Sequence, residues 1–232
     1  MKGSSISRRA PAFFCALLLC LGFLLVGGQP AMAWCNPNRT NDGSHWFDGW
    51  SHEIGSTVGG VYGNLSLYDP YVNSVDTSVW VMLENGSSYA QIGYLAKVGS
   101  PGPETGFTEY QDNGPFGFDY HEFPMPTLWS AEFKVLYGNT SGKFTFYANG
   151  VLERDHCQCF TPTGGQNFSE LQSKSDQMFG QASNHERMWN MHLYWSGAWH
   201  NFSGTASDDG QTSNWAFSVV NTQEIQIWDK CQ

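Results

Sequence analysis

Short runs in which apolar and polar side chains alternate are the feature that most limits how this chain can fold. In the run Ser130–Tyr137, apolar Ala131, Phe133 and Val135 alternate with charged or polar neighbours. A period of two places alternate side chains on opposite faces of a β-strand. No window after residue 33 combines apolar residues at helical spacing with helix caps. The sequence therefore predicts an all-β fold.

The expected strands are short and are separated by Gly, Asn, Asp and Pro, the residues that favour turns. They are Val58–Tyr68, Thr77–Glu84, Ser88–Val98, Thr105–Gln111, Ser130–Tyr137, Lys143–Ala148, Val151–Arg154, Met188–Trp195, Ala198–Phe202, Asn214–Val220 and Gln223–Asp229. Three stretches are expected to be irregular: residues 34–56, 113–126 and 157–176. This spacing of strands predicts a two-sheet antiparallel sandwich of the jelly-roll or concanavalin type.

The first 33 residues have the pattern of a cleaved signal peptide. A basic start with Arg8 and Arg9 precedes the apolar run Ala12–Val26, and Ala31-Met32-Ala33 offers small residues for cleavage before Trp34. The apolar run is short for a transmembrane helix. We therefore expect a secreted, monomeric protein in which residues 34–232 form a single β-sandwich domain, with no membrane attachment after cleavage.

Acidic residues outnumber basic ones, and this imbalance restricts the partners of the chain. The sequence has 21 Asp and Glu against 11 Lys and Arg, a formal net charge of −10. Such a balance argues against nucleic acid and against anionic membrane surfaces as partners. It suits an extracellular protein that works at mildly acidic pH on a polypeptide or a polysaccharide.

Four of the six cysteines lie after the signal segment: Cys35, Cys157, Cys159 and Cys231. An even number in an oxidising compartment predicts two disulfides. A bridge between Cys35 and Cys231 would join the two ends and leave Cys157 and Cys159 to close a very small ring, whereas the crossed pairings avoid that ring. The Cys-x-Cys spacing is a poor zinc motif, and we expect neither a metal nor a cofactor.

Familiar catalytic motifs such as a nucleophile elbow or a phosphate-binding loop are missing. The stretch Thr77–Asp112 instead offers an amide and a carboxylate. If the two strands are neighbours, alternation allows Gln91 and Glu109 to lie together on one face, among aromatic residues. Desolvation raises the pKa of a carboxyl group and suits it to acid–base work, and a neutral amide can donate to an oxyanion. The plainer interpretation is a solvent-facing pair on a half-exposed sheet.

Three segments of this stretch resemble glutamic peptidases. They are Val79-Trp80-Val81-Met82-Leu83, Tyr89-Ala90-Gln91-Ile92-Gly93-Tyr94 and Phe107-Thr108-Glu109-Tyr110. They are similar to the W-V-G-I, L-Q-T-G and Y-E-W strands of the eqolisin group, and the Q-x-G element resembles the neprosin-type secreted proteins. The resemblance covers roughly residues 77–112, and it implies a secreted β-sandwich with peptidase activity at acid pH.

The resemblance also implies roles for single residues. Gln91 matches the catalytic glutamine that stabilises the oxyanion, and Glu109 matches an acidic position that lines the cleft. The catalytic glutamate of the family, which activates water, falls on Gln181 in this chain. Glu109 or Glu186 would then have to act as the base, or the chain is a catalytically dead relative.

Aromatic residues on a concave sheet, with amides between them, also suit a carbohydrate-binding module without catalysis. The candidate aromatic contacts to substrate or sugar are Trp80, Tyr89, Phe107, Trp189, Trp195 and Trp199. A third class, a secreted structural or adhesion protein, needs no small-molecule site.

Overall fold

The computed structural model describes residues 46–67, 76–97, 105–114, 117–126, 128–138, 143–157, 159–171, 180, 183–208 and 215–230. The chain divides into two units, Met1–Trp34 and Cys35–Gln232, and all described residues belong to the second. The expected signal segment therefore lies outside the described residues. Among the described residues, no helix is long and apolar enough to cross a membrane.

The described residues form β-strands joined by turns. In chain order the strands are β1 (Trp46–Glu53), β2 (Val58–Ser66), β3 (Thr77–Asn85), β4 (Ser88–Ala96), β5 (Thr105–Gln111), β6 (Phe118–Pro124), β7 (Ser130–Tyr137), β8 (Lys143–Ala148), β9 (Val151–Cys157), β10 (Gly164–Leu171), β11 (Glu186–Trp195), β12 (Ala198–Asn201), β13 (Thr205–Asp208), β14 (Trp215–Asn221) and β15 (Glu224–Asp229). The predicted all-β class is confirmed.

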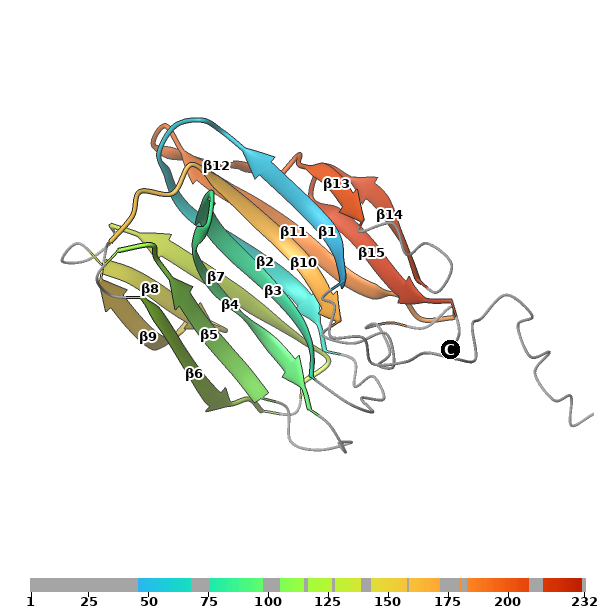
Figure 1. Ribbon diagram of the computed structural model, residues 1–232. Helices are drawn as coiled ribbons and strands as arrows, with labels where there is room; N and C mark the ends of the chain where they lie inside the picture. Colours follow the sequence, from blue (N-terminus) through green and yellow to red (C-terminus); the bar gives the residue numbers. More distant parts are fainter. Residues whose placement is uncertain are drawn as a thin grey trace, which may run out of the picture. The chain divides into compact units, whose positions relative to one another are not determined.

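Two antiparallel sheets pack face to face (Figure 1). The seven-stranded sheet has the order β13-β1-β10-β3-β4-β5-β6, and the second sheet has the order β14-β15-β11-β2-β7-β8-β9, with β12 paired to β11. The predicted two-sheet antiparallel sandwich is confirmed. Its β7-β8-β9 meander also follows the sequence prediction, with a turn at Asn149-Gly150 in which both residues have positive φ.

Because side chains alternate between the two faces of each strand, those that face the other sheet are mainly apolar and fill the space between the sheets. Val79, Val81 and Leu83 of β3 point into this core, where they belong to the same cluster as Phe133 and Leu193 of the second sheet. The intervening residues of β3 point to the outer face, where Trp80 and Met82 join a smaller apolar cluster with Leu95, Phe107 and Phe168. Strand β3 is consequently buried on both faces.

Three segments that were expected to be irregular are strands. Residues 46–53 form β1, residues 118–124 form β6, and residues 164–171 form β10, which lies between β1 and β3. In β1 and β10, Gly, Asn, Asp and Ser are frequent, and these residues ordinarily disfavour strands. Neighbouring strands supply the pairing that local propensity does not, because β-propensity depends strongly on context.

Gly93 is a point at which the central strands approach too closely for a side chain. A Cβ atom there would lie 2.1 Å from the backbone oxygen of Val79 and 2.6 Å from the Cβ of Trp80. At Gly63, by contrast, the nearest atoms belong to the flexible end of Met191. We expect Gly93→Ala to lower the free energy of unfolding by about 3 kcal/mol, because backbone must move, and Gly63→Ala to cost less.

Urea titration of both variants measures the two losses. Equal stability of Gly93→Ala and the parent protein would contradict the close packing of β3 against β4.

Candidate functional site

Gln91 and Glu109 lie side by side on the outer face of the seven-stranded sheet. They are direct cross-strand partners in the β4–β5 register. The Gln91 amide Nε2 donates a hydrogen bond of 3.1 Å to Glu109 Oε2, and the hydroxyl of Tyr89 donates to Oε1 of the same carboxylate. Two donors stabilise the ionised carboxylate. The amide, carboxylate and phenol thus form one hydrogen-bonded group.

The strand register explains why these side chains meet. Residues directly opposite each other in neighbouring antiparallel strands point to the same face. The row that contains the pair runs across five strands and consists of Gln166, Met82, Gln91, Glu109 and Tyr120. A shift of one residue in either strand would turn one member of the pair into the core.

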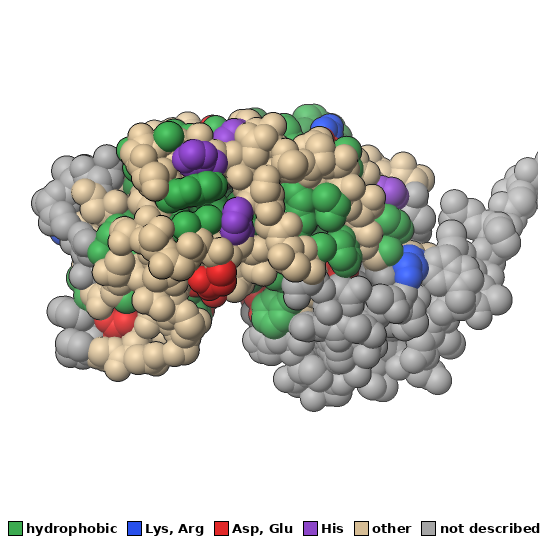
Figure 2. Space-filling view, turned by 90° about the horizontal axis from the view of Figure 1, so that it is seen from above, with side chains coloured by type: hydrophobic (Ala, Val, Ile, Leu, Met, Phe, Trp, Pro, Cys, Tyr) green, Lys and Arg blue, Asp and Glu red, His purple; other side chains and the backbone are tan. Residues whose placement is uncertain are grey.

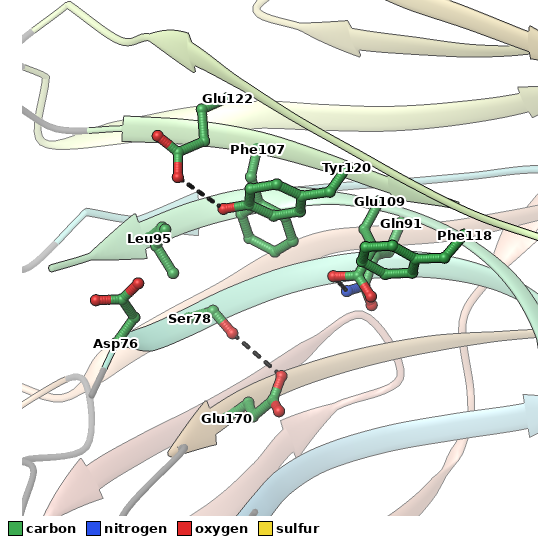
Figure 3. A pocket seen from close by; sticks show the side chains of 10 residues that line it. All are labelled: Asp76, Ser78, Gln91, Leu95, Phe107, Glu109, Phe118, Tyr120, Glu122 and Glu170. Carbon is green, nitrogen blue, oxygen red and sulfur yellow. Dashed lines mark hydrogen bonds between the residues drawn. The ribbon is translucent and has the colours of Figure 1, made fainter. Parts of the chain in front are cut away.

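The pair lies in a groove with a volume of about 390 Å³. The groove is lined by Asp76, Ser78, Gln91, Leu95, Phe107, Glu109, Phe118, Tyr120, Glu122 and Glu170 (Figure 3). In the close-up, Gln91 and Glu109 lie beside Phe118 at one end, and Asp76, Ser78 and Glu170 lie towards the other. A space-filling view from above shows acidic and hydrophobic side chains close together along one edge of the described surface (Figure 2).

Two tyrosines in the groove are held in the neutral form. Burial, reinforced by the hydrogen bond to Glu109 and its charge, raises the pKa of Tyr89 well above its ordinary value. Burial and the hydrogen bond to Glu122 do the same to the pKa of Tyr120. Both phenols therefore remain hydrogen-bond donors at neutral and acidic pH.

Glu122 and Glu170 also line the groove, and both accept hydrogen bonds. The hydrogen bond from Lys97 lowers the pKa of Glu122, with a further contribution from Tyr120, although burial opposes this. Glu170 accepts hydrogen bonds of 3.3 Å from the hydroxyl of Ser78 and from the indole of Trp80. Of the described groove-lining carboxylates, Glu109 is the one that contacts the Gln91 amide.

The structure separates Glu186, another predicted site residue, from this pair. Glu186 lies on β11 in the second sheet, with 0% of its surface exposed, so the expectation that it could serve the groove is corrected. Its strand pairs with β2 and β15, and its side chain is buried in the interior. Gln181 lies outside the described residues.

The aromatic candidates fall into two groups. Phe107 lines the groove and Tyr89 bonds to Glu109, but Trp80 is only 3% exposed and is part of the apolar layer of this face. Trp189, Trp195 and Trp199 belong to β11 and β12 of the second sheet, so they do not line this groove. The six aromatic candidates are therefore divided between the two sheets.

Several groove residues were missed by sequence reasoning. Phe118, Tyr120 and Glu122 come from β6, and Glu170 comes from β10, two strands that were expected to be irregular. In β6 the alternation of these three residues is visible in the sequence. In β10 no comparable signal exists, because Gly, Gln, Asn and Ser dominate it.

One of the possible disulfide pairings is present. Cys157 and Cys159 are bonded to each other, which is the small ring that the crossed pairings would have avoided. Cys35 and Cys231 lie outside the described residues. Within the described ranges, no cluster of three or more His, Cys, Asp or Glu side chains is arranged to hold a metal ion.

The β-sandwich fold is similar to that of glutamic peptidases. No protein-family model and no curated protein matches the sequence. Among solved structures, the chain is similar to scytalido-glutamic peptidase bound to a peptide-based transition-state analogue, with a TM-score of 0.57, 13% identity and coverage of 82% of this chain and 100% of that one. A second structure of that peptidase, with a transition-state analogue inhibitor, gives a TM-score of 0.54 at 13% identity, with the same coverage.

Two further matches are more distant. SCP-B, an eqolisin-family peptidase in complex with the tripeptide Ala-Ile-His, has a TM-score of 0.43 at 11% identity, covering 82% of this chain and 100% of that one. The CBM40 module of a Ruminococcus gnavus sialidase, bound to α2,3-sialyllactose, has a TM-score of 0.31 at 10% identity, covering 78% of this chain and 86% of that one. At 13% identity, the similarity to scytalido-glutamic peptidase concerns the fold.

Two neighbouring carboxyl groups, those of Glu84 and Glu53, lie beyond the end of the groove. Glu84 is 7% exposed and lies in the row next to Gln91, with Tyr89 as its partner on β4. Burial raises the pKa of Glu84, and the charge and hydrogen bond of Glu53 raise it further, while a hydrogen bond with Gln166 opposes them. A raised pKa in the folded state means that Glu84 contributes stability in acid, which is lost as the pH rises through that pKa.

We expect Glu84→Gln to be more stable than the parent protein at pH 7 and nearly equal to it at pH 4. Glutamine is neutral at both pH values, as the protonated Glu84 is at low pH. Thermal unfolding of both proteins at the two pH values measures the difference. A stability gain of the same size at pH 4 and pH 7 would contradict this assignment.

Proposed function

We propose that the chain is a glutamic-type endopeptidase that cleaves extended polypeptides in the groove of the seven-stranded sheet. The observation that carries the proposal is the direct hydrogen bond of 3.1 Å between the Gln91 amide and the Glu109 carboxylate in an open groove. Similarity of the fold to a peptidase of this class supports the same assignment.

Each member of the group has a chemical role. Glu109 takes a proton from a water molecule, which attacks the carbonyl carbon of the scissile peptide bond. The Gln91 amide carries two hydrogens, and the hydrogen that does not bond to Glu109 donates to the oxyanion that forms. Glu109 then returns the proton to the leaving amine. Tyr89 holds the carboxylate in position throughout.

The resemblance to glutamic peptidases places the catalytic base at the position of Gln181, whereas this proposal places it on Glu109. The base is placed on Glu109 because that carboxylate is the one in contact with the amide. The acidic lining, with Asp76, Glu122 and Glu170, favours substrates that carry positive charge, and such substrates are most abundant at acidic pH, where histidine is charged.

Glu109→Gln tests the base directly. We expect this change to reduce kcat/KM for denatured casein at pH 4 by at least about 100-fold, because the water loses its proton acceptor. Gln91→Ala should cost about 100-fold to 1,000-fold through loss of the oxyanion donor. Glu132→Gln, on β7 of the second sheet, is the matched control and should retain full activity.

Thermal unfolding checks that each variant is folded. Full activity in a folded Glu109→Gln protein, or no activity in the parent protein from pH 3 to pH 6, would refute the peptidase assignment.

A second candidate function is saccharide binding on the opposite face of the sandwich. Trp199 is 39% exposed, and its ring lies edge-on to Tyr62 and Tyr194, with centroid distances of 4.8 and 5.3 Å. His192 stacks on Tyr62 at 4.8 Å and bonds to the Gln223 amide at 2.8 Å. An exposed ring beside hydroxyl, imidazole and amide groups is suited to stacking on a sugar and bonding to its hydroxyls.

Replacement of the exposed ring tests this candidate. We expect the parent protein to be retarded in native gels that contain laminarin, xyloglucan or soluble xylan, and Trp199→Ala to lose most of this retardation. Trp189→Ala, in which the lost ring is covered by the Arg187 guanidinium, is the matched control and should stay retarded. Equal mobility of all three proteins in every gel would exclude the candidate.

A further inference from the structure

The disulfide between Cys157 and Cys159 contributes little as a structural clamp. It closes a ring across a sequence separation of two residues at the end of β9. A cross-link stabilises a fold mainly by restricting the unfolded chain, and this effect grows with the length of the closed loop. A ring this small restricts almost nothing. The bridge is therefore better suited to thiol–disulfide exchange than to stabilising the fold.

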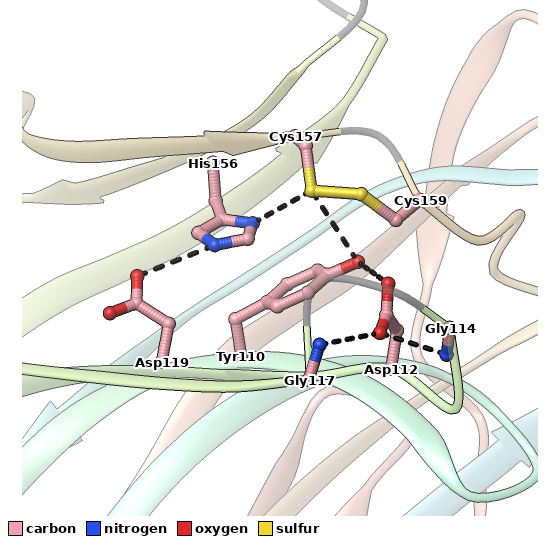
Figure 4. Close-up of a disulfide and its surroundings, with 8 residues drawn as sticks. All are labelled: Tyr110, Asp112, Gly114, Gly117, Asp119, His156, Cys157 and Cys159. Atoms are coloured by element: carbon pink, nitrogen blue, oxygen red, sulfur yellow. Dashed lines mark hydrogen bonds and ion pairs between the residues drawn. A yellow bond between two sulfur atoms is a disulfide. The ribbon is translucent and has the colours of Figure 1, made fainter.

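A histidine contacts one of the two sulfur atoms. The Nδ1 atom of His156 lies 3.1 Å from the Sγ atom of Cys157, and its Nε2 atom lies 3.4 Å from the Asp119 carboxylate (Figure 4). Because Nε2 faces the carboxylate, it is the nitrogen that carries the hydrogen, and Nδ1 is left to exchange a proton with sulfur. The order sulfur, imidazole, carboxylate is that of a nucleophile, its base and the group that orients the base.

The imidazole is held rigidly by its neighbours. The Tyr110 ring stacks on it at a centroid distance of 4.0 Å, and Arg154 pairs with Asp119 on the other side. Burial, together with the charge and hydrogen bond of Asp112, raises the pKa of Tyr110 well above its ordinary value, so the phenol stays neutral. Its hydroxyl lies 3.9 Å from the Cys157 sulfur.

The other charged groups near the histidine are already paired. Asp112 accepts hydrogen bonds from the backbone amides of Gly114 and Gly117, and Lys143 of β8 pairs with Asp155. Among the described residues around the sulfur, His156 is thus the group placed to give a proton to Cys157 or take one from it.

We propose that Cys157–Cys159 is a redox-active disulfide that exchanges with the thiols of a partner dithiol polypeptide, with His156 handling the proton. A thiolate of the partner attacks the Cys159 sulfur, the Cys157–Cys159 bond breaks, and its electron pair leaves on Cys157. His156, protonated at Nδ1, stabilises this thiolate or protonates it.

The second thiolate of the partner then attacks the mixed disulfide and releases Cys159. The partner is oxidised to a disulfide and this chain is reduced to a dithiol, a transfer of two electrons. The two protons that the partner thiols release on ionising are taken up by the Cys157 thiolate, through His156, and by the Cys159 thiolate, from solvent.

Alkylation of the reduced protein tests the role of the histidine. The folded protein is reduced with dithiothreitol, and the rate at which iodoacetamide modifies Cys157 is followed against pH by peptide mass spectrometry. We expect a midpoint at least one pH unit below the value of about 8.5 for free cysteine, because an imidazolium beside the sulfur favours the thiolate.

His156→Gln should raise that midpoint by at least one pH unit, and Asp119→Asn should raise it by a smaller amount. His121→Gln, which changes an exposed histidine of β6, should leave it unchanged. In glutathione buffers, His156→Gln should also need about 10-fold more reducing conditions for half reduction, since the reduced form loses its stabilised thiolate.

A double Cys157→Ser, Cys159→Ser variant separates exchange from a structural role. We expect its unfolding temperature to match that of the parent protein, whereas a large decrease would show that the bridge is a structural clamp and would overturn the proposal. An alkylation midpoint near 8.5 in the parent protein, or one that neither His156→Gln nor Asp119→Asn moves, would overturn it as well.

Discussion

The register between β3, β4 and β5 is the constraint on which the groove depends. These strands are paired so that each row across the sheet presents one kind of surface, with Val81 and Ile92 turned to the core and Met82 and Gln91 turned outward. Glu109 completes the outward row from β5. A shift of one residue turns each side chain of a strand to the opposite face, so the amide and carboxylate meet only in this register. Close packing at Gly93, which leaves no room for a Cβ, helps to fix it.

Much of this arrangement could be predicted from the sequence, and the exceptions have physical reasons. Alternation gave the strands on both sides of the pair, and parity placed Gln91 and Glu109 on one face. The β10 strand could not be predicted, since Gly164, Gly165 and Asn167 disfavour isolated strands and are paired here only because β1 and β3 flank them. Which sheet a strand joins is a further long-range property. Glu186 illustrates it, because its place in the second sheet depends on the pairing of β11 with β15 and β2.

The two faces of the sandwich differ in chemistry. The groove of the seven-stranded sheet is acidic and holds a hydrogen-bonded carboxylate, whereas the outer face of the second sheet presents Trp199, Tyr62 and the amide of Gln223. Similarity of fold at 13% identity does not choose between activities, because one fold can support many sites. The choice rests on which face holds groups that can move a proton. That argument favours the groove for hydrolysis and leaves the aromatic face for recognition.

Strand β5 links the groove to the disulfide. Glu109 and Tyr110 are adjacent in sequence and point to opposite faces, one towards Gln91 and the other towards His156 and Cys157. A single peptide unit therefore lies between the two sites, and a strand paired on both edges cannot rotate one residue without its neighbour. If reduction of the disulfide shifted the Tyr110 ring, the position of the Glu109 carboxylate would consequently change as well. The oxidation state of the disulfide and the position of the Glu109 carboxylate would then be coupled through a single strand.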